Sequence, residues 1–323
     1  MVCSYWRKST SWSCEKTTGR PSAASSFQSP RTKGPQSYTT SRRDKAALFS
    51  TLSSHRLPNN DIESNGNGNE NGDLIEGPQL NFSGISKLIE SDTEVSDASS
   101  IWYVVTTAAL LGLNRQSSIG QLWKYISDQC DHDTSRMLPI ARRIRESCLK
   151  SSVLVGFPHG INGLLSLQSA IEKHSHSLVP VLASDSSLRA PLTPAEKYDR
   201  GKDFFSSIYS KHTDRVLASM GRSSGGDLDY YAVSSVYGEL MAETSILGAA
   251  ETGILEFVCC LVADVAPQAK GHFFGCKNLG ATGAQMRGTI SLVGELATQL
   301  NFPPDRMPGA SSQYRFLEKA QEW

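Results

Sequence analysis

The sequence predicts an all-α fold, and three of its features carry that prediction. From Ser99 onward the chain consists of long apolar segments separated by short polar breaks. These segments lack the alternating runs of β-branched residues that mark β-strands. Two of them begin at Thr193-Pro194-Ala195-Glu196 and Thr282-Gly283-Ala284-Gln285, where a capping Thr precedes an acid or amide by three positions, as at many helix starts.

The residues before this region have a different composition. Residues 1–79 are rich in Ser, Thr, Asn, Gly and Arg, and residues 65–72 are almost entirely Asn and Gly. Such a segment buries too little apolar surface to offset the entropy lost on ordering. We therefore expect a disordered leader over 1–79, one helical domain over 80–310, and a C-terminal tail over 311–323.

The leader is also basic. Residues 1–43 contain eight Lys and Arg residues and a single acid, Glu15. A basic, Ser-rich, acid-poor segment is typical of a mitochondrial transit peptide, so we expect a mitochondrial location. The leader could instead be a plain disordered tail or reflect a misplaced translation start. The alternative locations are the cytoplasm and the peroxisome. A peroxisomal location would have to be reached without a C-terminal signal, because Ala320-Gln321-Glu322-Trp323 is not a Ser-Lys-Leu type address.

The helices follow from apolar residues that recur three and four positions apart, as in Ile119, Leu122, Trp123 and Ile126. In chain order we predict helices over residues 100–113, 118–129, 135–155, 159–174, 194–219, 227–243, 248–264, 268–280 and 284–300.

The segment 254–265 is apolar nearly all round, except for Glu256 and Asp264. A helix of this kind belongs in the centre of a bundle. Asp264 to Pro267 interrupts it, Pro267 is suited to open a new helix, and Gly280 is suited to close that helix.

A weak internal duplication is visible around the two prolines of this region. Pro158 and Pro267 lie 109 positions apart, and each follows a buried helix and precedes a second apolar helix rich in small residues. We interpret this as a two-fold internal repeat of helical hairpins.

Several classes of protein are excluded by composition. Seven cysteines without a Cys-x-x-Cys argue against a disulfide scaffold or a metal site, and we expect no cofactor. No apolar run of about eighteen residues is present, so we expect no membrane span. Basic residues after the leader alternate with acids, which argues against a nucleic-acid partner.

Four stretches carry a resemblance to a known family. They are Arg143–Pro158, Arg200–Tyr209, Tyr237–Thr252, and Ala266-Pro-Gln-Ala-Lys-Gly-His272 with Leu279-Gly-Ala-Thr282. Together they resemble the carboxymuconolactone decarboxylase-like family, whose helical fold is shared with alkyl hydroperoxidase D. The resemblance implies a homo-oligomer, usually a trimer or hexamer, and a small-molecule site near His272.

The chain departs from the hydroperoxidase branch of that family. The two cysteine positions of that branch fall on Val265 and Gln268, and its carboxylate position falls at or near Gly253. The resemblance therefore does not imply a Cys-x-x-Cys hydroperoxidase.

The candidate site residues gather on the helix that Pro267 opens. His272 is the proton-transfer candidate, because imidazole titrates near neutral pH. Gln268 and Cys276 lie one turn before and after it, and Lys270 lies between them. The free N–H groups at the helix start favour a carboxylate there. We expect a pocket bordered by these groups, with Glu251 or Glu256 reaching in from the preceding helix.

The leading functional hypothesis is a decarboxylase-like enzyme that acts on an organic acid or lactone through His272. One alternative is a family member that has lost its chemistry and persists as an oligomeric binding or scaffolding protein. A second alternative, peroxide reduction through Cys276, is disfavoured because the local sequence supplies no resolving thiol.

Overall fold

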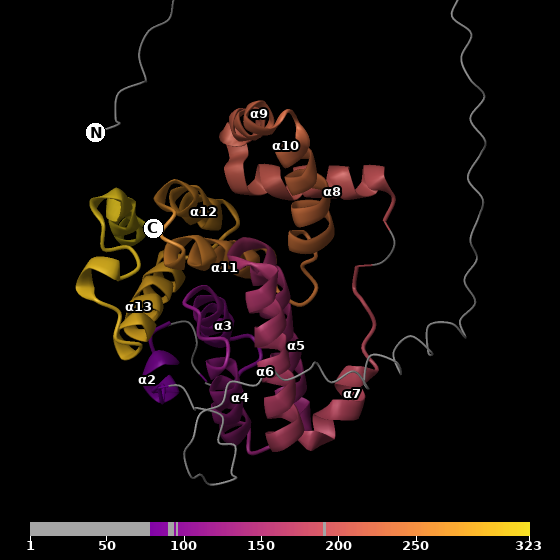
Figure 1. Cartoon of the computed structure of the whole chain (residues 1–323), viewed down its shortest axis with the longest axis vertical. Helices are drawn as coiled ribbons and strands as arrows, with labels where there is room; N and C mark the ends of the chain where they lie inside the picture. The colour runs from indigo at the N-terminus through magenta and orange to yellow at the C-terminus, as the bar shows by residue number, and fades with distance from the viewer. Residues whose placement is uncertain (1–77, 90–93, 95, 190–191) are drawn as a thin grey trace, which may run out of the picture. The chain divides into compact units, whose positions relative to one another are not determined.

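The computed structural model describes residues 78–89, 94, 96–189 and 192–323, and these residues lie within one compact unit, Asn71–Trp323. Every regular element in these ranges is a helix, which confirms the predicted all-α fold (Figure 1). The expected leader over residues 1–79 falls almost wholly outside the described residues.

Helices occupy most of the described chain. In chain order they are α2 (Phe82–Ile85), α3 (Trp102–Gly112), α4 (Ser118–Gln129), α5 (Thr134–Val155), α6 (Phe157–His174), η1 (His176–Leu178), α7 (Val179–Ala183), α8 (Pro194–Tyr209), η2 (Ser210–His212), α9 (Thr213–Ser224), α10 (Asp227–Tyr231), the π-helix η3 (Ala232–Met241), α11 (Ala249–Val262), α12 (Ala266–Asn278), α13 (Gly283–Gln299), η4 (Pro304–Arg306) and η5 (Ser312–Glu322).

Seven of the nine predicted helices match the structure to within about two residues. The expected helix over 194–219 is wrong, because the chain breaks at Ser210, whose φ is 48°, and divides into α8, η2 and α9. The expected helix over 227–243 is continuous over Asp227–Met241 but changes at Ala232 from α to π geometry, which gives α10 and η3. Apolar periodicity continues across Ser210 and across this change of geometry, so it reveals neither.

Two helices form the centre of the core. Every residue of α3 from Trp102 to Leu111 is buried, and so is every residue of α11 from Thr252 to Leu261. The prediction that the segment after Ile254 lies inside a bundle agrees with this burial. α3 and α11 contact each other, and α5 and α13 pack against both.

A helical hairpin stands at each of the two places that the repeat predicts. α5 and α6 form the first, and α11 and α12 form the second. Each elbow contains one residue in the left-handed region, Gly156 with φ 111° and Asp264 with φ 54°. The two hairpins meet through α5 and α11.

The segment 311–323, expected as a tail, is part of the core. η5 buries Tyr314, Phe316 and Ala320, and the Phe316 and Trp323 rings contact Phe273 of α12. η5 was not predicted because its apolar residues are few and no helix cap of the Thr-Pro type precedes it.

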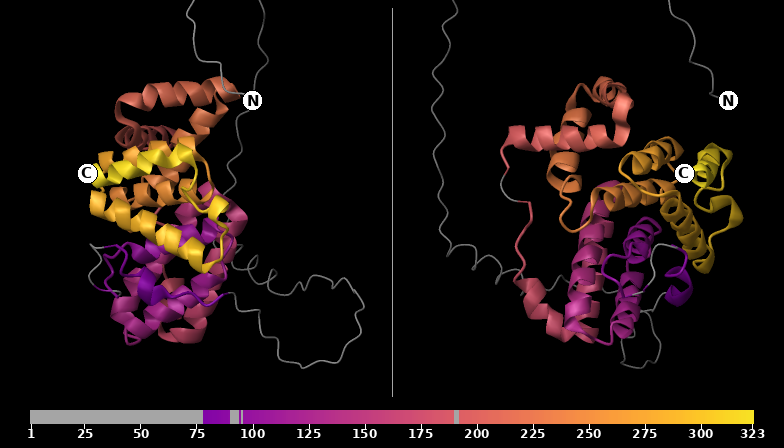
Figure 2. Two further views of the ribbon diagram at one scale, coloured as in Figure 1. Left: turned by 90° about the vertical axis from the view of Figure 1, so that its left-hand side faces the viewer. Right: turned by 180° about the vertical axis from the view of Figure 1, so that it is seen from behind.

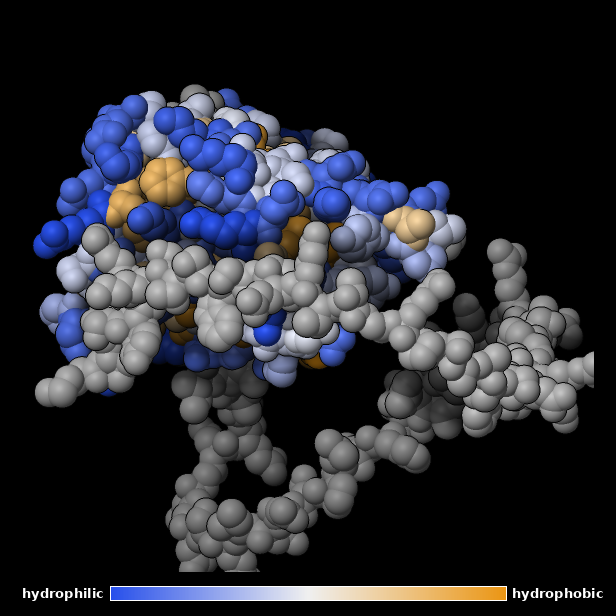
Figure 3. All heavy atoms as spheres, turned by 90° about the horizontal axis from the view of Figure 1, so that it is seen from above, coloured by the Kyte–Doolittle hydropathy of each residue, from blue (hydrophilic) through white to orange (hydrophobic). Residues whose placement is uncertain are grey.

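α8, α9, α10 and η3 form a group beside the α11–α12 hairpin (Figures 1 and 2). Its face in Figure 3 is mostly hydrophilic, with separated hydrophobic spots. α8 and η3 approach so closely that only glycine fits at the crossing. A Cβ on Gly201 would lie 1.9 Å from the Val233 carbonyl oxygen, and one on Gly238 would lie 1.9 Å from that of Lys197.

This close approach predicts the effect of adding a methyl group. Gly201→Ala forces two backbones apart, so we expect it to lower the free energy of unfolding by about 3 kcal/mol. Gly294 of α13 is the matched control, because a Cβ there meets nothing within 4 Å. Gly294→Ala should instead stabilise the chain by up to about 1 kcal/mol. Equal midpoints in urea unfolding for the two variants would contradict the assigned helix crossing.

Candidate functional site

A buried carboxyl–imidazole pair lies between α11 and α12. Glu256 is 0 % exposed and His272 is 6 % exposed. The Nδ1 atom of His272 lies 3.5 Å from the Oε2 atom of Glu256. The elbow at Asp264 folds α12 back along α11, and this return places the two side chains opposite each other.

Two tyrosines extend the pair toward α8 and η3. The hydroxyl of Tyr209 lies 3.4 Å from Nε2 of His272, and the ring of Phe205 contacts the rings of both Tyr209 and Tyr237. Burial raises the pKa of both phenols above the usual value, and the Glu256 carboxyl nearby raises each pKa further. Both tyrosines therefore remain protonated at neutral pH and are available as hydrogen-bond donors.

The carboxyl group of Glu256 has unused hydrogen-bonding capacity. Both of its oxygens and the Nδ1 atom of His272 are shielded from solvent. None of these three atoms has a hydrogen-bond partner within the described part of the chain. Buried polar groups are normally paired, and leaving one unpaired costs roughly 1–3 kcal/mol. These three atoms therefore retain hydrogen-bonding capacity inside the fold.

Two thiols border this cluster. Burial raises the pKa of both the Cys276 and Cys260 thiols, and the Glu256 carboxyl raises each pKa further. Each thiol therefore stays neutral at physiological pH, and a neutral thiol is a poor nucleophile. Gly253 of α11 also borders these residues, since a Cβ there would lie 3.8 Å from Sγ of Cys276 and 2.7 Å from the Leu279 side chain.

Glu251 does not reach His272. Its carboxylate accepts hydrogen bonds from the Arg143 guanidinium, one at 2.6 Å, and from the backbone N–H of Gly248 at 2.7 Å. Arg143 also donates to the Tyr103 hydroxyl at 2.8 Å. Glu251 thus caps α11 and neutralises a buried arginine, and Glu256, just over one turn later, is the acid that meets the histidine.

Gln268 and Lys270 lie outside the cluster as well. Both are exposed, whereas His272 and Cys276 on the same helix are buried. The covering tyrosine, Tyr209, contacts α12 at Gly271 and His272 and leaves the first turn to solvent. Gln268 and Lys270 therefore do not share the buried environment of His272 and Cys276, and the pocket expected beside these residues stays a prediction.

The tyrosines of the cluster were not singled out from the sequence. Tyr209 and Tyr237 lie within two stretches that carry the family resemblance, but nothing in their spacing shows that they meet. The contact depends on the crossing of α8 and η3, which brings Phe205, Tyr209 and Tyr237 together. The one signal in the sequence that could have pointed to these tyrosines is that both lie in stretches that carry the family resemblance.

Lys150 is a second buried ionisable group that sequence reasoning did not single out. Its ammonium group is wholly buried and donates to the carbonyls of Met241 and Glu243 and to the Thr252 hydroxyl at 2.6–3.2 Å. These bonds join α5 to both ends of the connection between η3 and α11. Desolvation lowers the pKa of Lys150 from its usual 10.5 to about 8, against the opposing effect of Glu146.

The lowered pKa of Lys150 predicts a pH dependence of stability. Between about pH 8 and 10.5 the folded chain has released the Lys150 proton and the unfolded chain still binds it, so unfolding takes up a proton. The free energy of unfolding of the wild type should therefore rise with pH, relative to that of Lys150→Met, by on the order of 2 kcal/mol. Paired urea unfolding curves at pH 7.5 and 10 measure this difference, and a fall or no change would show that Lys150 stays charged in the fold.

The fold and the cluster together define a class, an all-helical protein with a buried carboxyl–imidazole pair. Comparison with known proteins assigns the family. Peroxisomal protein 2 of Schizosaccharomyces pombe is 31% identical over 197 residues, which cover 61% of this chain and 85% of that protein. Peroxisomal protein 2 of Saccharomyces cerevisiae is 30% identical over 190 residues, 53% of this chain and 67% of the relative. The chain belongs to the peroxisomal protein 2 family.

No protein-family model matches the chain, and no solved structure matches it. The two relatives overturn one expectation. Both carry a peroxisomal name, so the mitochondrial location and the transit peptide inferred from the basic leader were wrong. A basic, Ser-rich composition is shared by many leaders and tails and does not specify an organelle.

The described helices agree with the expectation that the chain contains no membrane span. In the ranges that the structure describes, no helix combines the length and the apolar character needed to cross a bilayer.

Proposed function

We propose that the chain is a small-molecule enzyme that moves a proton on an organic acid or lactone, with His272 and Glu256 as its acid–base pair. The observation that carries the proposal is the Glu256 carboxyl, which is wholly buried, lacks a hydrogen-bond partner among the described residues, and lies 3.5 Å from His272. Acid–base catalysis needs such groups in a site that excludes water.

The geometry suggests a role for each side chain. In the decarboxylation of an acid whose α-carbon is also conjugated to a ketone or lactone carbonyl, the bond between the α-carbon and the carboxylate breaks and carbon dioxide leaves. The electron pair is then delocalised onto that carbonyl oxygen as an enolate. The phenol of Tyr209 is placed to donate a hydrogen bond to the enolate oxygen, and His272 to supply the proton that the carbon takes up. The charge of Glu256, 3.5 Å from Nδ1, stabilises the protonated form of the imidazole.

The resemblance to carboxymuconolactone decarboxylase-like proteins supports the same chemistry. Its Gly-His signature contains His272, which the structure places in the cluster. The raised pKa of the Cys276 thiol is unfavourable to thiol-dependent peroxide reduction.

A second candidate function, an oligomeric binding or scaffolding protein, is favoured by the surface of α6. Phe157, Ile161 and Leu165 are each more than half exposed and lie one turn apart on one face. An exposed apolar stripe of this kind suits a contact between copies, as in the trimers or hexamers of the family that the chain resembles.

The names of the two relatives support a peroxisomal location. We expect a fluorescent fusion of the full chain, with the tag internal to an exposed loop, to overlap with a peroxisomal matrix marker. A diffuse cytoplasmic signal, or overlap with mitochondria, would contradict this expectation.

The catalytic proposal predicts a loss of turnover that is separate from a loss of folding. Carboxymuconolactone and related lactone and oxo acids form the substrate panel, with carbon dioxide release and the shift in melting temperature as readouts. For any acid that is turned over, His272→Gln and Glu256→Gln should each lower kcat by roughly 10²–10⁴-fold. His212→Gln, at an exposed histidine of η2, is the control and should leave kcat unchanged.

The opposite pattern would favour the scaffold function. In that case no acid of the panel raises the melting temperature, and His272→Gln changes only stability. A loss of the oligomer on changing Ile161 to Asp would then identify the α6 stripe as the functional surface.

A further inference from the structure

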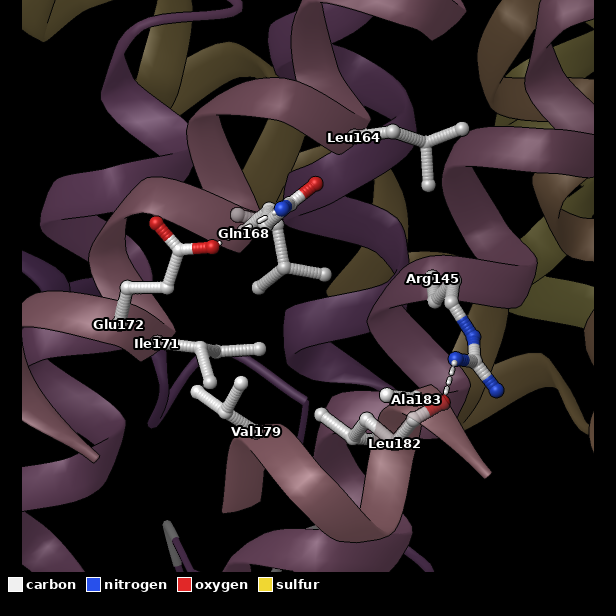
Figure 4. A pocket seen from close by; sticks show the side chains of 9 residues that line it. Arg145, Leu164, Gln168, Ile171, Glu172, Val179, Leu182 and Ala183 are labelled. Atoms are coloured by element: carbon white, nitrogen blue, oxygen red, sulfur yellow. Dashed lines mark hydrogen bonds between the residues drawn. The ribbon is translucent and has the colours of Figure 1, made fainter. Parts of the chain in front are cut away.

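A two-part cavity lies outside the His272 cluster, between α5, α6 and α7. Its apolar chamber has a volume of about 350 Å³ and is lined by Leu164, Leu167 and Ile171 of α6 and by Val179 and Leu182 of α7. Figure 4 shows Leu164, Ile171, Val179 and Leu182 around a common space, with Arg145 at one side and Glu172 at the other. The volume lies within the range of small-molecule sites.

A polar chamber of about 710 Å³ adjoins it and shares Arg145 and Leu164 with it. Arg142, Arg145 and Arg189 line this chamber, together with the acids Glu146 and Asp185. The apolar chamber therefore opens beside a cluster of charged groups.

The charges of the polar chamber do not balance. Asp185 accepts from both Arg142, at 2.7 Å, and Arg145. Glu146 accepts from Arg189 and lies 3.8 Å from the buried ammonium group of Lys150. Each carboxylate thus faces two cations.

A neighbouring acid, Glu243, lies outside the lining; it pairs with Arg200 at 3.4 Å and also interacts with Arg189 and Lys150. The residues that line the chamber are three arginines and two carboxylates, which leaves one surplus positive charge for an anionic head group to neutralise.

We propose that this cavity binds an alkyl carboxylate, with its chain in the apolar chamber and its head group at Arg145 and Arg142. Arg145 is the charged residue that both chambers share, so a ligand with its chain against α7 presents its carboxylate there. None of the residues that line either chamber belongs to the His272 cluster. The proposal therefore stands independently of the acid–base function.

Calorimetric titration of the full chain with decanoate tests the proposal. We expect saturable binding that strengthens about fourfold for each methylene from hexanoate to decanoate, as burial of a CH₂ group requires. Decanol and decyltrimethylammonium, with the same chain and no negative charge, should bind at least tenfold more weakly. Absence of saturable decanoate binding, or equal binding of decanol, would overturn the proposal.

Two substitutions at exposed or half-exposed positions test the contributions of the two chambers separately. Ala183→Trp, at the exposed end of α7, fills the apolar chamber and should abolish decanoate binding. Arg145→Gln should weaken it at least tenfold. Arg222→Gln, at an exposed arginine of α9, is the matched control and should leave the Kd unchanged.

A third substitution has an expected effect of opposite sign. Asp185→Asn removes the carboxylate that competes for Arg142 and Arg145, so decanoate should bind several-fold more tightly. General damage to the cavity would weaken binding instead. Weaker or unchanged binding in Asp185→Asn, with an unchanged melting temperature, would contradict the head-group assignment.

Discussion

The packing of the helices depends on the neutralisation of charged side chains that α5 buries inside the bundle. α5 places Arg143, Glu146 and Lys150 in the interior, where an unpaired charge is strongly destabilising. Each therefore takes partners from another segment. Arg143 holds the start of α11 through Glu251, and Lys150 holds the end of η3 through two carbonyls. These contacts hold both ends of the connection between η3 and α11. They fix the register of α11 against α5 and therefore the position of Glu256 on α11.

The sequence predicted the helices better than it predicted their contacts. Caps and apolar spacing are local signals, so the starts at Thr193 and Thr282 and the buried segment after Ile254 could be derived from them. The pairing of His272 with Glu256 rather than Glu251 could not, because it depends on the direction of the Asp264 elbow and on the ion pair that Arg143 forms with Glu251. Tyr209 meets His272 where α8 packs on α12, and the glycines of α12 allow this approach, since a Cβ on Gly275 would lie 2.5 Å from the Ile208 side chain.

The two candidate binding regions differ in their chemistry. The His272 cluster combines proton-transfer groups with almost no solvent contact, which suits a small ligand that is enclosed entirely. The α5–α7 cavity combines fixed cations with aliphatic side chains, which suits a ligand with a charged end and an apolar body. α5 connects the two regions physically, since Lys150 contacts Glu146 at the cavity and Thr252 on α11, one turn before Glu256.

The π-helix η3 has a genetic consequence. Its i→i+5 bonding places more residues in each turn than an α-helix has, so the ten residues Ala232–Met241 complete fewer turns than α-helical residues would. Loss of a single codon in this segment can be absorbed by a return to the tighter α geometry, so the residues beyond the deletion largely keep their facing. The same loss within an α-helix such as α8 would rotate the residues beyond it by about 100°. A change of one residue in chain length is therefore tolerated more easily in η3, which contains Tyr237, than in α8, which ends at Tyr209.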